Sequence, residues 1–403
     1  VIEGQRRTHR LDISRSILMG DIARRGATRH MKSLIRSAAY RGTYATISAL
    51  NRVVPKREQA IVYSFPDYAP NAIAMSNALL EYTDLDVVWL VRDVEKAPPL
   101  SLVQSDRITV ANHQSPLGIA AFTRAKYVFS THGIYGDRSA KKGQTTVQLW
   151  HGMPLKPIGA LDGQPSLGEP TWVVAASPFW TSFLAGVFEV RPDQVVSTGL
   201  PRDELLLAQP TDTVRSALEK LVGVRPYAKL LVWLPTYRAS VVGDVRVDGS
   251  ESGNTVQAED FDPEPINEAL KRQDTVCLVK RHPMSPTYEE ADYSNLIFVT
   301  DDHLGTVGLD LYSLLALSDG LITDLSSVWI DYLVTGKPIL FFFPDLDAYR
   351  VGRGLLHEPY GEFVPGRLVE KAAELPAAFD SFWDEAPLFA KDRERSRRRL
   401  NSD

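Results

Sequence analysis

The chain has 403 residues, of which 44% are hydrophobic and 24% charged, with 45 Lys plus Arg against 50 Asp plus Glu. This composition is typical of a globular protein of roughly two or three domains, and it excludes collagen-like, low-complexity and wholly disordered chains. The single cysteine, Cys277, excludes an internal disulfide and a cysteine-based zinc site, so we expect a reducing compartment. The longest apolar runs, Lys229–Pro235 and Pro338–Pro344, are far shorter than the ~18 residues that a membrane-spanning helix needs.

The charge is unevenly distributed along the chain. Residues 1–57 contain eleven Arg and two Lys but only three acidic residues, whereas the remaining sequence is acidic. Apolar residues such as Ile17, Leu18 and Ile22 recur there at helical spacing. We interpret residues 1–57 as a basic amphipathic helical arm that associates with a membrane surface. A solvated helix packed on the body and a nucleic-acid contact remain as alternatives.

After Pro55, short apolar strands alternate with helices in two series, which predicts two α/β domains with doubly wound parallel sheets. The first series has predicted strands at Ala60–Ser64, Asp86–Val91, Lys126–Ser130, Val147–Trp150 and Trp172–Ala175, and helices near Asn71–Glu81, Pro116–Thr123 and Pro178–Ala185. The second has strands at Leu230–Leu234, Thr275–Arg281, Leu296–Val299, Gly320–Thr323 and Pro338–Phe343, and helices near Pro263–Lys271, Leu309–Ala316 and Ser326–Leu333. We expect domains at residues 58–200 and 201–370 and a helical tail at 371–403.

The segment Gln148–Lys156 places His151 directly after a predicted apolar strand. Ligands of open α/β sheets bind beyond the carboxyl ends of the strands. An imidazole can take a proton from a hydroxyl nucleophile near neutral pH, and Gly152 allows a close approach of the backbone. His151 is therefore a candidate base, with a structural role as the alternative.

Three segments of the second series place polar groups at strand ends. Lys280, Arg281 and His282 lie at the end of one strand, and Lys and Arg can neutralise phosphate. Ser326 and Ser327 follow Thr323 and Asp324, and either serine could cap the next helix or bind phosphate at its start. Arg238 follows a third strand. A solvated basic turn, capping alone and a structural Arg are the respective alternatives.

Several well-known motifs are missing from the sequence, including the P-loop, the Rossmann glycine fingerprint and the nucleophile elbow. We interpret Asp301-Asp302-His303 as a loop and predict no metal site. Cationic side chains and a helix start would then have to stabilise phosphoryl charge.

In their order and spacing, these segments resemble the CDP-glycerol glycerophosphotransferase family of teichoic acid and capsule polymer primases and polymerases. The resemblance covers roughly residues 58–370. Its most specific parts are Trp-His-Gly-x-Pro-Leu-Lys from Trp150 and Ile-Thr-Asp-x-Ser-Ser from Ile322. Gly199–Asp203, Gly336–Pro338, Arg353-Gly354 and Ser64–Asn71 also match. Leu325 and Tyr237 depart from the pattern, because the family commonly has an aromatic residue and often Trp at these positions.

The resemblance implies a GT-B fold, with two Rossmann-like domains facing a cleft, the first for the acceptor and the second for the CDP-linked donor. It implies that His151 is the base and that His282 is a second essential histidine near the donor pyrophosphate. The implied donor contacts are Arg238, Lys280, Arg281, Thr323, Asp324, Ser326, Ser327 and Arg353. The implied acceptor-side or structural residues are Asp67, Asn71, Gly152 and Lys156.

The reaction implied by the resemblance transfers a polyol phosphate, with glycerol phosphate preferred, from CDP-glycerol or another CDP-polyol. The implied acceptor is the hydroxyl of a lipid-linked (polyprenyl) molecule or growing polymer, CMP is released, and no cofactor is expected.

We expect a peripheral enzyme at the cytoplasmic face of the bacterial membrane. No nucleic-acid partner is expected, because no base-reading motif accompanies the arm. A GT-B glycosyltransferase and a non-catalytic membrane or polymer-binding protein remain as alternatives. The polyol, the choice between primase and polymerase, and the oligomeric state stay open.

Overall fold

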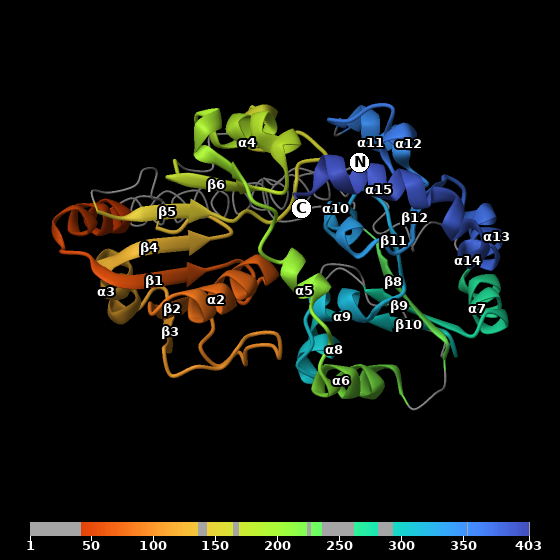
Figure 1. Cartoon of the computed structure of the whole chain (residues 1–403), viewed down its shortest axis with the longest axis horizontal. Coiled ribbons are helices and arrows are strands. Elements are labelled where there is room, and N and C mark those ends of the chain that lie inside the picture. The colour runs from red at the N-terminus through yellow and green to blue at the C-terminus, as the bar shows by residue number, and fades with distance from the viewer. Residues whose placement is uncertain are drawn as a thin grey trace, which may run out of the picture.

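The computed structural model describes residues 42–135, 143–163, 169–223, 227–235, 262–280, 293–352 and 354–402. Two parallel β-sheets, of seven and six strands, form the framework of two halves that lie side by side (Figure 1). The prediction of two doubly wound parallel-sheet domains is confirmed. Within the described residues, no helix is both long enough and apolar enough to cross a bilayer.

The first sheet has the strand order β3-β2-β1-β4-β5-β6-β7. Its strands are β1 Arg57–Tyr63, β2 Asp86–Val91, β3 Ile108–Asn112, β4 Ala125–Ser130, β5 Thr145–Gln148, β6 Trp172–Ala175 and β7 Val195–Ser197. Its helices are α2 Pro70–Tyr82, α3 Pro116–Arg124, η1 Gly159–Asp162, η2 Pro178–Trp180, α4 Thr181–Phe188 and η3 Pro192–Gln194.

Helices cover both faces of this sheet because successive side chains of a strand point to opposite sides. Ala60 and Val62 of β1 pack with Ile73 of α2, whereas Ile61 packs with Phe122 of α3. The start of α3 is fixed by Ser115, whose hydroxyl accepts a hydrogen bond from Gly118 N at 3.0 Å. Burial on both faces explains why β2 and the second part of β1 read as continuous apolar runs.

The second sheet has the order β10-β9-β8-β11-β12-β13. Its strands are β8 Lys229–Leu234, β9 Thr275–Lys280, β10 Leu296–Val299, β11 Gly320–Thr323, β12 Ile339–Phe342 and β13 Arg367–Val369. The helices of this half are α5 Asp203–Leu207, α6 Asp212–Val222, α7 Pro263–Arg272, α8 Asp301–Thr306, α9 Leu311–Leu317, α10 Val328–Tyr332, η5 Leu333–Thr335, α11 Leu346–Gly352 and α12 Tyr360–Phe363. The tail contains η6 Ala372–Glu374, α13 Leu375–Asp380, α14 Phe382–Glu385, η7 Ala386–Phe389 and α15 Ala390–Leu400.

Some elements differ from the sequence-based expectation. The strand expected at Val147–Trp150 ends at Gln148, and residues 301–303 begin helix α8, so their interpretation as a loop was wrong. Strands β3, β7 and β13 were not predicted. The latter two have only three residues each, and β3 lies at the edge of its sheet with exposed residues, so none has a long apolar run.

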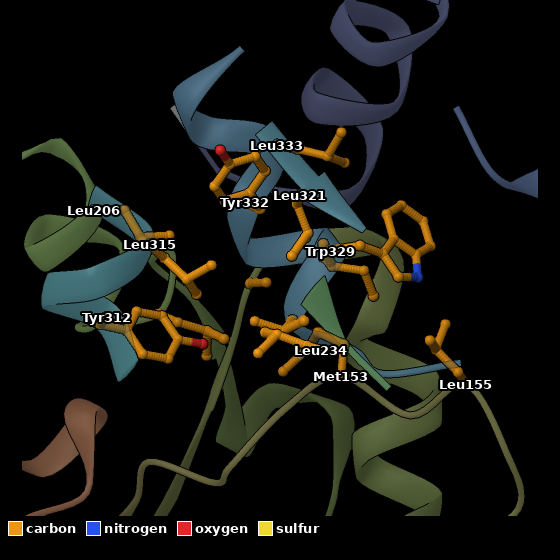
Figure 2. Close-up of a cluster of buried hydrophobic side chains, with 14 of the residues drawn as sticks. Met153, Leu155, Leu206, Leu234, Tyr312, Leu315, Leu321, Trp329, Tyr332 and Leu333 are labelled. Atoms are coloured by element: carbon orange, nitrogen blue, oxygen red, sulfur yellow. The ribbon is translucent and has the colours of Figure 1, made fainter. Parts of the chain in front are cut away.

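One large hydrophobic core contains residues from both halves of the chain. Figure 2 shows Met153 and Leu155, which follow the first-half strand β5, lying among second-half side chains that include Leu234, Leu321 and Trp329. Full burial of a Met or Leu side chain contributes about 1.5–3 kcal/mol. This shared core fixes the position of the segment around His151 against the second half.

The two ends of the described chain also pack on the body. Residues 42–53 are helical, Ile47 of this helix is buried, and Asn51 Nδ2 donates to Gln144 Oε1 at 2.7 Å. Helix α15 brings the tail back to the first half, where Trp180 Nε1 donates to Leu400 O at 2.9 Å. Residues 1–41 of the predicted arm lie outside the described residues.

Candidate active site

His151 lies beyond β5, whose carboxyl end points toward the second half, as do those of β1 and β4 (Figure 1). The preceding turn is set by Trp150, which has a φ of 60° and donates from its backbone N–H to Gln148 Oε1 at 3.1 Å. Asn71 Nδ2 donates to Trp150 O at 3.0 Å and to Leu149 O at 3.3 Å. The predicted near-site residue Asn71 therefore holds the backbone that presents His151.

His151 is exposed as a whole residue, yet its imidazole lies against the rings of His132 and Trp150. Its ring stacks on His132, with 4.8 Å between centroids and 12° between planes. Desolvation by these neighbours lowers the pKa of His151 to about 3, and the charges of His132, Arg202 and Lys156 act in the same direction. A hydrogen bond with the Thr131 backbone partly opposes this lowering of the pKa. The imidazole is therefore neutral at pH 7, which is the form that accepts a proton.

The backbone of Gly152 approaches Ser327 of the second half very closely. A Cβ atom at position 152 would lie 2.2 Å from Ser327 Oγ, so a residue larger than glycine would force this hydroxyl or the backbone to shift. Ser327 directly precedes α10, and its side chain makes no capping hydrogen bond, so the structure does not support the alternative in which Ser327 caps this helix. The two most specific sequence segments, around His151 and around Ser326–Ser327, thus meet across the two halves.

Arg202 connects these segments and was not predicted as a site residue. Its Nη1 donates to His151 O at 2.9 Å, and its Nη2 lies 2.6 Å from Asp331 Oδ2 on α10. Its backbone N–H donates to Asn71 Oδ1 at 3.1 Å. The guanidinium and Asp331 are both buried, and Tyr312 donates its hydroxyl hydrogen to Asp331 Oδ2 at 2.5 Å. The Gly199–Asp203 segment therefore serves as a buried junction between the halves.

The charge of the Arg202 guanidinium acts on two buried carboxyl groups, those of Asp331 and Asp203. Burial raises the pKa of Asp331, and burial together with the charge of Asp331 raises the pKa of Asp203 to about 8. Asp203 Oδ2 accepts a hydrogen bond from Leu200 N at 3.1 Å. Because Asp331 contacts Arg202 directly, we assign the negative charge to Asp331 and the proton to Asp203 at neutral pH.

The donor-side residues that the structure describes lie at the carboxyl ends of β9 and β11, the strands on either side of β8. Thr323 is buried and donates its hydroxyl hydrogen to Leu234 O at 3.1 Å, which ties β11 to β8. Asp324 is buried, and its carbonyl accepts from Tyr360 Oη at 2.9 Å. Lys280 Nζ lies 2.9 Å from Asp301 Oδ1 at the start of α8. These contacts hold the strand ends together.

Four predicted site residues lie outside the described residues: Arg238, Arg281, His282 and Arg353. The described chain reaches Pro235 after β8 and Lys280 at the end of β9, on the sheet edge that also carries Ser326 and Ser327. The roles of the four residues remain predictions.

Asp67 and Lys156 follow strands β1 and β5 of the first sheet and lie in different settings. Both carboxylate oxygens of Asp67 accept backbone hydrogen bonds, from Arg92 N at 2.9 and 3.0 Å and from Asp93 N at 3.1 Å. Asp67 therefore fixes the loop that follows β2. Lys156 Nζ lies 5.8 Å from the centroid of the Tyr349 ring, so it reaches the second half.

His132 was missed by the sequence interpretation, although it follows the predicted strand that ends at Ser130. Thr131 Oγ1 lies 3.0 Å from His132 Nδ1, and burial lowers the pKa of His132. The search for polar residues after each strand, which identified His151, would also have identified His132 if applied to β4. Within the described residues, no group of three or more His, Cys, Asp or Glu side chains is suited to hold a metal ion.

The known proteins that are similar in sequence to this chain include two teichoic acid enzymes. The teichoic acid glycerol-phosphate transferase of Staphylococcus aureus is 26% identical over 366 residues, covering 86% of this chain and 89% of that protein. The teichoic acid ribitol-phosphate primase of Bacillus spizizenii is 26% identical over 253 residues, covering 58% of this chain and 60% of that protein.

A solved structure of the wall teichoic acid polymerase TagF, a variant soaked with CDPG, matches with a TM-score of 0.71 and 20% identity, covering 94% of this chain and 93% of that chain. This match confirms the predicted GT-B fold class. The family profile described as CDP-Glycerol:Poly(glycerophosphate) glycerophosphotransferase matches residues 46–402. The chain therefore belongs to the CDP-glycerol:poly(glycerophosphate) glycerophosphotransferase family.

Proposed function

We propose that the protein transfers a polyol phosphate, with glycerol phosphate as the first candidate, from a CDP-polyol to an acceptor hydroxyl. The acceptor is a lipid-linked molecule or a growing teichoic-acid-like or capsule polymer. Family membership and the activities named for the relatives support this class of reaction. The observation that carries the proposal is the close approach of the His151-Gly152 segment to Ser327, because it brings a candidate base beside a candidate phosphate-binding turn.

In the proposed step, the neutral imidazole of His151 takes the proton of the acceptor hydroxyl. The hydroxyl oxygen forms a bond to the phosphorus that carries the polyol, while the bond from that phosphorus to the oxygen of CMP breaks. CMP leaves with the bonding electron pair as an anion. Positioning and charge stabilisation accomplish most of such a transfer, so the proposal includes no covalent enzyme intermediate and no cofactor.

The donor side of the site would come from the second half. We assign stabilisation of the leaving group to Lys280 and to the Ser326–Ser327 turn, together with Arg238, Arg281, His282 and Arg353. The negative charge of a bound pyrophosphate would raise the lowered pKa of His151, because it offsets the nearby positive charges. The base would thus become stronger once the donor is bound.

We further propose that the reaction takes place at the cytoplasmic face of the membrane, with residues 1–41 as the basic arm, because residues 42–57 of the predicted arm pack on the body. A Lys or Arg near an anionic surface contributes about 1 kcal/mol to membrane binding. The high content of Arg and Lys in this segment supports the proposal.

The test is to incubate the full chain with CDP-glycerol or CDP-ribitol and a lipid-linked acceptor, and to measure nucleotide release and product mass. We expect CMP and a product that is heavier by one or more polyol phosphate units. Release of a nucleoside diphosphate from a nucleotide sugar would instead indicate glycosyl transfer. Absence of turnover with both CDP-polyols would contradict the proposed function.

A further inference from the structure

A row of planar side chains extends along the carboxyl edge of the first sheet, beginning at His151. The residues follow β5, β4, β1 and β2, which are consecutive neighbours in the sheet. Beyond the His151–His132 stack, the edge of His132 meets the Phe65 ring with 5.6 Å between centroids and 89° between planes. The guanidinium of Arg92 lies 4.0 Å from the centroid of the Phe65 ring. A continuous surface thus connects the candidate base to a cation.

Hydrogen bonds hold this row in place. The Phe65 N–H donates to Thr131 Oγ1 at 3.3 Å, and the same oxygen contacts His132 Nδ1. The backbone of Arg92 is fixed by the buried carboxylate of Asp67. Because the loops after three strands are joined in this way, the surface is formed before any ligand arrives, and binding costs less ordering entropy.

The outer part of the row is open to solvent. Phe65 is 45% exposed, and Arg92 is exposed as well. Among the residues that the structure describes, no carboxylate forms an ion pair with the Arg92 guanidinium, which lies over the Phe65 ring. Oδ1 of Asp93, the neighbouring acid, accepts from Glu95 N at 3.0 Å. The ring and the cation are therefore both available to a ligand.

We infer that Phe65, Arg92 and His132 form the acceptor subsite, in which an anionic phosphodiester binds Arg92 and the polyol chain crosses the Phe65 ring toward His151. The inference rests on the proposed function and extends it to the chemistry of the acceptor. A guanidinium matches the geometry of phosphate oxygens and forms charge-assisted hydrogen bonds with them. The candidate donor-phosphate residues Lys280, Ser326 and Ser327 lie on the other half, which leaves this row to the acceptor.

The test compares Arg92→Gln with Arg124→Gln in the full chain. Arg124 is an exposed arginine in the last turn of α3, on the same half. Calorimetry would measure binding of a soluble glycerol-phosphate oligomer and of a neutral polyol of similar length, and CMP release would give the acceptor KM. CDP-glycerol binding serves as the internal reference.

We expect Arg92→Gln to weaken oligomer binding and to raise the acceptor KM about tenfold or more, because a charge-assisted hydrogen bond is lost. Arg124→Gln should stay within about twofold of the wild type in both measurements. Phe65→Leu should weaken binding of the oligomer and of the neutral polyol alike, because the ring contacts carbon rather than phosphate.

Unchanged oligomer affinity and acceptor KM in Arg92→Gln would overturn the inference while leaving the proposed function intact. Oligomer binding that depends on Arg92, in a protein that releases no CMP, would uphold the subsite and reject the proposed function. Vesicles containing phosphatidylglycerol provide a third arm. If Arg92→Gln reduced vesicle binding but not oligomer binding, Arg92 would belong to a lipid-headgroup site and the inference would be wrong.

Discussion

Arg202 and Asp331 form a buried ion pair in the second half, where it meets the first, with 2.6 Å between Nη2 and Oδ2. The same guanidinium donates to His151 O, and Asp331 lies on α10, which begins directly after Ser327. One side chain therefore links the backbone of the candidate base to the helix that follows the candidate donor turn. A shift of either half would stretch this connection.

Replacing Arg202 by Met should strongly destabilise the protein. Removing one partner of a buried pair leaves an uncompensated charge and costs about 3–5 kcal/mol. The free energy of unfolding in urea would measure this loss. Arg272→Met is the matched control, because Arg272 forms an exposed pair with Asp380 at 2.8 Å, and such pairs contribute about 1 kcal/mol or less. Equal losses in the two variants would contradict the role assigned to the buried pair.

Gly152→Ala should impair activity more than folding. The new methyl group would collide with Ser327 Oγ, so the serine hydroxyl or the His151 segment must shift, at a cost of about 1–3 kcal/mol. We expect turnover to fall about 10²-fold, since small displacements of reacting groups have effects of this size. Gly305→Ala is the control, because nothing lies within 4 Å of its Cβ position. Full activity of Gly152→Ala would show that the close approach is not needed.

His151→Asn should remove most of the transfer activity. Loss of a general base typically lowers the rate about 10²–10⁴-fold, whereas CDP-glycerol binding should persist because Asn has no charge and fits the same space. Measuring CMP release beside donor affinity separates the two effects. Near-normal turnover in this variant would reject His151 as the base.

The pH dependence of the wild type provides a second readout for His151. A base acts in its unprotonated form, and the lowered pKa keeps His151 neutral far below pH 6.5. The free protein should therefore show no titration of His151 between pH 5 and 8 in imidazole NMR spectra. His132→Phe retains a stacked ring but removes a repelling charge, so it should raise the pKa of His151.

Asp203 should make the protein less stable as the pH rises. Its pKa is raised in the folded state, so folded molecules keep a proton that unfolded molecules release above pH ~3.9. The free energy of unfolding should therefore fall between that pH and the raised value, by up to about 1.4 kcal/mol per pH unit. Asp203→Asn should remove this part of the slope, whereas Asp84→Asn, at an exposed position, should retain it. Parallel curves for the wild type and Asp203→Asn would contradict the assigned protonation.

Removing residues 1–41 should release the protein from anionic vesicles. The cut preserves residues 42–57, which include buried Ile47 and the start of β1, so the body should keep its folding transition. Vesicle sedimentation would measure binding, and thermal unfolding would control for damage to the fold. Unchanged sedimentation would favour the alternative in which the arm packs on the body.

Sequence patterns predicted the elements that are buried on two faces and failed where burial is partial. Asp86–Val91 was placed without error because five successive apolar residues are fully covered. Strand β3 has exposed residues and contains no such run of buried apolar residues. The Arg202–Asp331 pair could not be predicted from the sequence, for a different reason. Each residue reads as an ordinary surface charge, and only the packing of the halves buries them together.

The contacts between α15 and the first half affect the order in which the chain can fold during synthesis. Ser177 Oγ donates to Arg399 O at 2.9 Å, and Ser402 N donates to Ala176 O at 2.5 Å. During synthesis the first sheet emerges early, and domains generally fold in the order in which they leave the ribosome. These contacts nevertheless cannot form until residues 399–402 have emerged. The side of the first half that faces α15 therefore stays uncovered until the second half has been synthesised. Fusions or truncations near residue 400 will disturb the contacts with Ala176 and Ser177, which lie more than two hundred residues earlier in the chain.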